Sequence, residues 1–189
     1  MSRSGCAVYI WAVTDGEASH AESPSWTKEV LAKVRTKESE QALAMLCSAY
    51  RRTRLAIPDG AVTRYEDELG SILAASFNPG DIVFAPWDLD GHPDHEAVSR
   101  ASRRAADLRQ CRFLEIPIWG WHWADPYMGN FPLHRAVAIM LTPEEQRVKY
   151  KAIQAFQSQL QPDHETGKPA ILPDYALARL LRPYEVLLR

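Results

Sequence analysis

The chain has 189 residues, of which 46% are hydrophobic, and its 22 basic and 24 acidic residues leave a formal net charge of -2. A nearly balanced charge excludes the positive field that attracts polyanions over a whole surface, so we expect no nucleic-acid partner. This length is enough to bury a core and short enough for one domain spanning residues 1–189.

Cysteine usage and hydropathy limit the compartment. Cys6, Cys47 and Cys111 are odd in number and far apart, which argues against a disulfide framework and a thiolate zinc site. No stretch reaches the roughly 18 consecutive apolar residues that a membrane-spanning helix needs. The apolar run at 6–13 is short and lacks a signal-peptide cleavage pattern. We therefore expect a soluble, cytoplasmic protein without a membrane span.

Strands and helices alternate along the first half of the chain. The β-branched and aromatic run at 6–13 predicts a buried strand. A long amphipathic pattern follows it, with Ser25 as the expected N-cap. The clearest buried strand is 81–86, and a histidine motif comes directly after it. In order, the expected elements are a strand at 6–13, a helix at 26–50, a strand at 53–57, a helix from Tyr65 to about Asn78, a strand at 81–86 and a helix at 96–108.

The second half continues this alternation. A strand at 112–118 is followed by an aromatic loop at 119–132 and a strand at 134–141. Thr142 precedes a proline and two glutamates, which is typical of an N-cap and first helical turn, and we expect this helix to run to about residue 160. The tail at 171–189 predicts a short helix and an apolar end that packs on the body.

The alternation predicts an α/β fold with a mostly parallel sheet covered by helices on both faces. In such sheets, ligands bind beyond the carboxyl ends of the strands. The polar stretches at 14–17 and 87–95 each follow a strand. We therefore expect both stretches at the same rim of the sheet.

The stretch WDLDGHPDHEAVSR, residues 87–100, carries the strongest chemical signal. His92 and His95 are three apart at the start of a predicted helix, a spacing that turns both imidazoles to one side. Imidazole is a common zinc ligand, and its second nitrogen usually needs an acceptor, for which Asp94 is a candidate. Gly91 allows the backbone to bend sharply. The alternative is a polar surface turn, but the strand-end position favours a site.

The segment GHPDHEAVSRA, residues 91–101, resembles the second signature of the PIG-L, or LmbE-like, family of zinc-dependent N-acetylglucosaminyl deacetylases. The segments AVTDGEASH, RTKESEQAL, LAIPDG and KYKAIQAFQSQL resemble further parts of the family in the same order. The resemblance covers nearly the whole chain. It implies a Rossmann-like three-layer α/β sandwich and hydrolysis of an acetamide on a small N-acetylated amino sugar or related molecule.

The resemblance also implies residue roles. In the family a metal-bound water attacks the amide carbonyl, and zinc polarises that carbonyl. His95 matches the metal ligand, and His92 matches the histidine that stabilises the oxyanion or protonates the leaving amine. Asp94 matches the acid that orients His92, and Asp15 is a candidate neighbour of the substrate. Zn²⁺ or another divalent ion is the expected cofactor if the site is completed.

One family segment has no counterpart in the chain. The family's first signature, a His-Pro-Asp-Asp-Glu stretch after the first strand, supplies two further metal ligands and the general base. Only MSRSG precedes the strand at 6–13. We therefore expect a fold that lacks its first strand and helix, in a fragment of a longer protein or a decayed family member. The exposed sheet edge that would remain offers a route to an oligomer.

The aromatic loop at 119–132 is a candidate substrate surface. Aromatic faces suit sugar rings, so we expect Trp121 and His122 to contact the substrate, while the alternative is that the tryptophans fill space under a long loop. Two functions stay open. The first is a metal-dependent deacetylase, and the second is a non-catalytic protein that binds a sugar or a partner, because one protein ligand cannot hold zinc tightly. A third possibility is that a second subunit completes the site.

Overall fold

The computed structural model describes residues 5–189 as helices and strands that form two compact units. Unit 1 comprises the described residues of Met1–Asp59 together with Leu141–Pro183, and unit 2 comprises Gly60–Met140 together with Tyr184–Arg189. The expectation of one domain over the chain stays a prediction. No helix of the described part is both long and apolar enough to cross a membrane.

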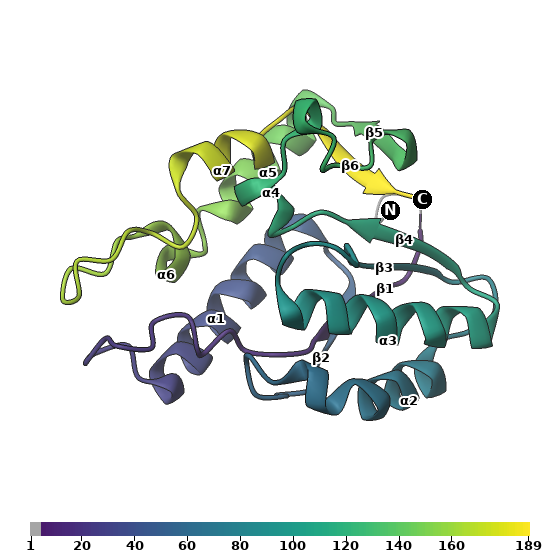
Figure 1. Cartoon of the computed structure of the whole chain (residues 1–189), viewed down its shortest axis with the longest axis horizontal. Coiled ribbons are helices and arrows are strands. Elements are labelled where there is room, and N and C mark those ends of the chain that lie inside the picture. Colours follow the sequence, from purple (N-terminus) through teal and green to yellow (C-terminus); the bar gives the residue numbers. More distant parts are fainter. Residues whose placement is uncertain (1–4) are drawn as a thin grey trace. The chain divides into compact units, whose positions relative to one another are not determined.

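Unit 1 combines a two-stranded parallel sheet with four helices. Strand β1 (Val8–Ala12) pairs in parallel with β2 (Tyr50–Arg54), and the long helix α1 (Lys28–Leu46) connects them (Figure 1). A parallel pair needs such a crossover, because the chain must return to the same end of the sheet. The other helices of this unit are α5 (Pro143–Ile153), α6 (Gln157–Leu160) and α7 (Asp174–Leu180).

The boundaries in unit 1 differ from the predicted ones for local reasons. Thr27, rather than Ser25, caps α1 by accepting a hydrogen bond from the Val30 N–H. The Ser25 hydroxyl donates instead to Glu165, at 2.5 Å. Strand β2 ends before Ala56, whose φ of 54° is left-handed and interrupts an extended strand. Sequence patterns do not show either event.

The helix after Thr142 begins as predicted and ends earlier. Thr142 and Glu145 form a complete capping box, with the proline in the first turn, which confirms the predicted start. The helix stops at Ile153, and the separate short helix α6 follows. In α6, the backbone N–H and hydroxyl of Ser158 both donate to the buried carboxylate of Glu38. These two hydrogen bonds, between residues far apart in the sequence, hold α6 against α1.

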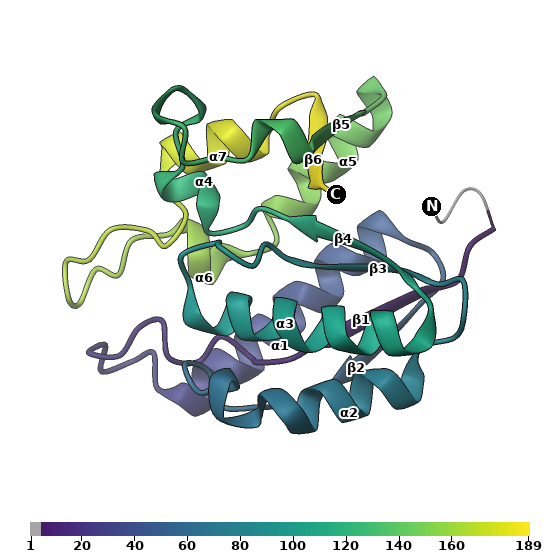
Figure 2. The ribbon, with the colours of Figure 1, turned by 45° about the vertical axis from the view of Figure 1, so that its right-hand side comes forward.

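Unit 2 contains a four-stranded mixed sheet in the order β3-β4-β6-β5. Strands β3 and β4 are parallel, and β6 runs antiparallel to both of its neighbours. Helix α3 packs on β3 and β4, and α2 lies side by side with α3 (Figures 1 and 2). The bounds are α2 (Glu66–Ser76), β3 (Ile82–Pro86), α3 (Pro93–Arg109), β4 (Arg112–Ile116), α4 (Gly120–Trp123), β5 (Ala136–Met140) and β6 (Tyr184–Leu188).

Helix α3 packs through the small apolar face that its sequence predicts. Ala97 and Ala101 are fully buried, and Ala105 is 2% exposed. Small side chains allow α2 and β3 to approach α3 closely, and these are the elements it contacts most. The start of α3 is thereby held at the end of β3, where the histidine motif lies.

The predicted tail is confirmed, because its helix is present as α7 and its apolar end packs in the core. The pattern did not show that this end forms strand β6, which lies between β4 and β5. Leu187 and Leu188 are 8% and 0% exposed, so the strand contributes to the core of unit 2. The partners of this strand lie far away in the sequence, and a short apolar run does not reveal such pairing. The α/β class with parallel strand pairs is confirmed.

Candidate active site

The site forms where β3 ends and α3 begins. The chain leaves β3 at Pro86, turns through residues 87–91, and enters α3 at Pro93, with His92 in extended conformation at the N-cap. Gly91 has a φ of 79°, and a Cβ atom there would lie 2.7 Å from Nε1 of Trp123. Both observations require glycine at this position. The tight turn places the histidines at the carboxyl end of a parallel strand, as predicted.

Asp90 is the most enclosed polar residue of this turn. It is 0% exposed, and its carboxylate accepts a hydrogen bond from His95 Nδ1 at 2.6 Å. Burial raises the pKa of Asp90, but the His95 bond and the backbone N–H groups outweigh burial, so the pKa lies below its usual value. The backbone donors are Ile118, Trp119 and Gly120, at 2.9, 2.6 and 2.8 Å.

The two histidines of the motif lie against each other, as their spacing predicts. The ring centroids of His92 and His95 are 4.5 Å apart. The edge of Trp119 lies 5.7 Å from the His92 ring, and Trp119 stacks on His122 at 4.1 Å. The site is therefore a continuous row of four aromatic rings, three of them imidazoles. Such a surface combines groups that bind or transfer protons with a flat apolar face.

Asp94 holds the start of α3 in place. Its side chain is buried, and its carboxylate accepts hydrogen bonds from the backbone N–H groups of Gly60 and Val62, at 2.7 and 3.1 Å. These bonds connect the first turn of α3 to the loop before α2. The predicted role of Asp94 toward His92 stays a prediction.

The two residues predicted to contact substrate differ in their surroundings. His122 belongs to the row of rings described above, one ring removed from His92. Trp121 instead stacks on Phe131 at 6.0 Å, and Phe131 also meets the buried ring of Trp87. His122 is therefore beside the motif, whereas the stacking partner of Trp121 is Phe131, within the 119–132 segment. Substrate contact by either residue stays a prediction.

Asp15, the candidate substrate neighbour in unit 1, lies in an ion pair. Both of its carboxylate oxygens accept from Arg54, at 2.7 and 2.5 Å, and Thr36 donates to it at 3.4 Å. Its side chain is 5% exposed. These contacts account for the buried carboxylate of Asp15 without a substrate. A role of Asp15 in a substrate site stays a prediction.

The side chains of the site offer few ligands for a catalytic zinc ion. Zinc in such sites normally takes three protein ligands and one water or substrate. His95 presents one suitable atom, Nε2, since Nδ1 is bonded to Asp90. Within residues 5–189, no three His, Cys, Asp or Glu side chains come together in a way that could hold a metal ion. The described residues alone therefore do not fit a three-ligand zinc site.

Two positions of the site were not predicted, namely Asp90 and Trp119. Asp90 stands five residues before the histidine that it contacts, and its other partners come from the segment after β4. The signal available in the sequence was an acid beside a glycine at a strand end. Trp119 opens the aromatic loop, but only the fold brings its ring to His92.

A second unusual charge lies in unit 1. The Nε and Nη2 atoms of Arg35 are buried and have no hydrogen-bond partner within the described part of the chain. Burial lowers the pKa of Arg35, and the carboxylates of Asp59, Glu38 and Glu17 oppose this effect. A Cβ atom on Gly16 would collide with the guanidinium. Buried donors without partners are rare in native proteins, because each one costs stability.

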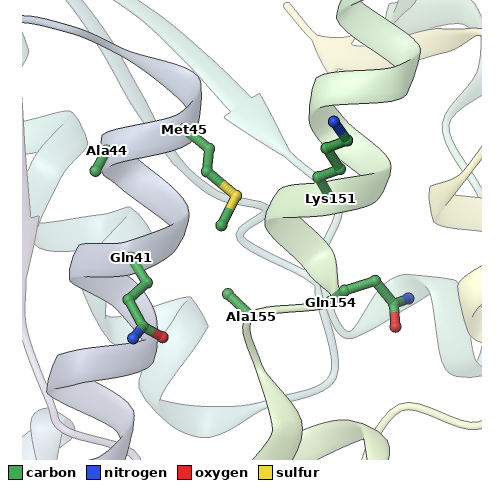
Figure 3. A pocket seen from close by; sticks show the side chains of 6 residues that line it. All are labelled: Gln41, Ala44, Met45, Lys151, Gln154 and Ala155. Carbon is green, nitrogen blue, oxygen red and sulfur yellow. The ribbon is translucent and has the colours of Figure 1, made fainter.

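Unit 1 also has an open groove between α1 and α5, with a volume of about 690 Å³. Met45 extends from α1 toward α5 across this groove (Figure 3). None of the predicted site residues lines it. The lining residues are Gln41, Ala44, Met45, Lys151, Gln154 and Ala155.

The family comparison gives one match. The model of the PIG-L family, described as GlcNAc-PI de-N-acetylase, matches residues 1–106, which is more than half of the 189 residues. No curated protein matches the chain significantly.

Solved structures resemble the chain over nearly its whole length. The conserved protein TT1542 from Thermus thermophilus is 21% identical, with a TM-score of 0.62, covering 99% of this chain and 83% of that one. N,N'-diacetylchitobiose deacetylase from Pyrococcus horikoshii is 20% identical, with a TM-score of 0.60, covering 96% and 67%. The zinc inhibited form of teicoplanin deacetylase Orf2 is 18% identical, with a TM-score of 0.65, covering 98% and 88%. These likenesses confirm the predicted fold.

Proposed function

Since the chain belongs to the PIG-L family, we propose that it is a hydrolase that removes the acetyl group from an N-acetylated amino sugar or a related small amide. The observation that carries this proposal is the pair of imidazoles at the start of α3, with His95 bonded to a fully buried carboxylate. Two of the structural relatives are named as deacetylases, which agrees with this activity.

The reaction is the addition of water to an amide. The water oxygen bonds to the carbonyl carbon, the C–N bond breaks, and the amine leaves with a proton while acetate forms. We assign His92 to this proton transfer or to the oxyanion, because it stands at the N-cap of α3 beside His95. The stacked rings of Trp119 and His122 supply a face for the sugar ring.

A divalent metal, in first place zinc, is part of the proposed function. It would supply a Lewis acid and an activated water, and Nε2 of His95 is the ligand that this chain offers it. The described residues do not provide the remaining ligands. We therefore assign no step of the reaction to the metal and no described residue to water activation.

The cysteines support a proposal for the compartment. Cys47 and Cys111 are free thiols. Free thiols are usual in a reducing environment, so we propose that the protein acts in the cytoplasm on a small molecule. A second copy bound at a sheet edge stays a prediction, which sedimentation at increasing concentration would test.

The first experiment is an assay of the full 189-residue chain with a chromogenic N-acetylglucosaminide and N,N'-diacetylchitobiose, with and without added Zn²⁺. Released amine and acetate are both measured, because true hydrolysis yields them in equal amounts. We expect the His92→Gln variant to lose about 10²- to 10⁴-fold in kcat, the usual contribution of a positioned acid or base. The His134→Gln variant, exposed outside the site, is the control and should keep wild-type activity.

The alternative is a binding protein without catalysis. The observation that favours it is the missing three-ligand cluster among the described residues. Calorimetry with the same sugars separates the two functions. Binding that His122→Ala weakens, with no amine released at any metal concentration, would support the alternative and contradict the hydrolase.

A further inference from the structure

We propose that Asp90 is the positioning residue of this site: it fixes the tautomer of His95 and, through the same carboxylate, the aromatic turn that carries Trp119. Its role in catalysis rests on the proposed deacetylase function, whereas the tautomer does not. The family resemblance assigned no role to this residue.

The hydrogen bonds of Asp90 are saturated. An ionised carboxylate offers about four lone-pair sites, and four donors surround this one. Oδ1 accepts from Ile118 and Gly120, and Oδ2 accepts from Trp119 and from His95 Nδ1. Three of these donors are backbone N–H groups, which favour the ionised carboxylate. Because an ionised carboxylate has no proton to donate, Asp90 is also an acceptor toward the fourth partner.

The consequence for His95 is a defined tautomer. Nδ1 must carry the proton, and in the neutral ring Nε2 then has a free lone pair. Free histidine exchanges between both forms, so a single tautomer requires a fixed acceptor. Because Asp90 is 0% exposed, water does not compete for its carboxylate. His95 thus presents a lone pair at Nε2.

The same residue positions the aromatic turn. Its backbone carbonyl accepts a hydrogen bond from Trp123 Nε1 at 2.8 Å, so Asp90 holds both ends of the segment 118–123. The backbone N–H of Trp119 donates to Asp90, and the Trp119 ring contacts both His92 and His122. Displacement of Asp90 would therefore move His95 and the ring beside His92 together.

A purely structural role makes a different prediction. If Asp90 only anchored the turn, its loss would lower stability and leave the tautomer of His95 unchanged. The Asp90→Asn variant separates the two roles. Its amide oxygen should take the place of Oδ1, where it keeps two backbone donors, and its NH₂ then faces His95 Nδ1. That nitrogen must become the acceptor, so the proton moves to Nε2.

The test is ¹⁵N NMR of the full chain labelled at histidine, at a pH where the imidazoles are neutral. The His95→Gln variant assigns the His95 signals by their absence. For the wild type we expect a protonated Nδ1 and an unprotonated Nε2, and the opposite pattern in Asp90→Asn. With the chromogenic substrate, Asp90→Asn should lower kcat about 10- to 100-fold, as loss of a ligand-orienting partner usually does.

The matched control is Asp88→Asn, which lies two residues away and outside the His95 contacts. It should leave both the tautomer and kcat as in the wild type. A folded Asp90→Asn protein with the wild-type tautomer would overturn the proposal. If that variant does not fold, the wild-type spectrum alone decides, because a proton on Nε2 of His95 would refute the assignment. A wild type without activity but with protonated Nδ1 would contradict the proposed function and leave the positioning role standing.

Discussion

Asp90 in unit 2 is a fully buried charge and Arg35 in unit 1 is a partly buried one, and their surroundings are opposite. Asp90 has a donor for each of its acceptor sites, and its pKa lies below the usual value although burial alone would raise it. Arg35 has two buried nitrogens without a hydrogen-bond partner in the described residues, and burial lowers its pKa. A saturated charge fixes its neighbours, whereas an unsaturated one costs stability.

This difference separates two uses of a buried charge. Asp90 organises the turn and the histidine around it, so the fold depends on it. Arg35 is held near three carboxylates, and two of its nitrogens are buried without a hydrogen-bond partner in the described residues. Such donors lower stability rather than organise the fold.

The largest expected effect is on Asp90. Replacement by alanine leaves three backbone N–H groups without an acceptor, that of Gly120 buried and those of Ile118 and Trp119 part-buried. A buried group in this state costs on the order of 1 to 3 kcal/mol. We expect Asp90→Ala to lower the free energy of unfolding by about 3 kcal/mol or more in urea denaturation. Asp88→Ala, which removes a partly exposed carboxylate nearby, should cost less than about 1 kcal/mol. Equal losses in both variants would remove the distinction drawn for Asp90.

Gly16 tests how tightly Arg35 is enclosed. Alanine at this position meets a left-handed φ of 70° and the Arg35 guanidinium, so we expect Gly16→Ala to cost about 1 to 3 kcal/mol. Gly167 is the matched control in the same unit, with the same φ and no atom near its missing Cβ. Gly167→Ala should cost only the backbone part, about 1 kcal/mol. The additional cost of Gly16→Ala over Gly167→Ala should decrease in a protein that also carries Arg35→Met.

Replacing Arg35 itself is expected to raise the free energy of unfolding, whereas the substitutions above lower it. The charged form is penalised by burial, which is the largest cause of its lowered pKa. The variant Arg35→Met keeps the apolar stem and removes the charge, so the free energy of unfolding in urea should rise by about 1 kcal/mol. Lys33→Met, an exposed change on the same helix, should stay within about 0.5 kcal/mol. A destabilised Arg35→Met would show that the carboxylates compensate the charge.

The smallest expected effect on stability comes from the ion pairs that Glu66 forms with two arginines of α3. Hydrogen bonds from Arg100, and then Arg104, lower the pKa of Glu66 against the opposing effect of burial. A lowered carboxylate pKa contributes stability above its unfolded value of 4.5, and this contribution is lost as the pH falls through the folded value. Both arginines are largely exposed, so Glu66→Gln should cost only about 0.5 kcal/mol at about pH 7.

The pH series makes this last comparison specific. The difference between wild type and Glu66→Gln should decrease below pH 4.5 and vanish at lower pH. Glu68→Gln, exposed on the same helix, should show no such trend. A difference that persists at low pH would mean that Glu66 acts through packing rather than charge.

Local patterns predicted much of the molecule. The capping box at Thr142, the small face of α3 and the pairing of the two imidazoles were all predicted, because each depends on residues within one or two helical turns. The N-cap of α1 and the end of β2 were not, since Glu165 and a left-handed Ala56 decide them.

By itself, the sequence determined the α/β class, the family and the position of His92 and His95 at a strand end, because periodicity, spacing and short motifs are local properties. Only the tertiary structure decided that Leu187 and Leu188 belong to a central strand, that Asp90 rather than a nearer acid bonds to His95, and that the aromatic turn lies against the histidines. The reason is physical: these features depend on hydrogen bonds and packing between segments far apart in the chain, which exist only once the sheet and helices have assembled.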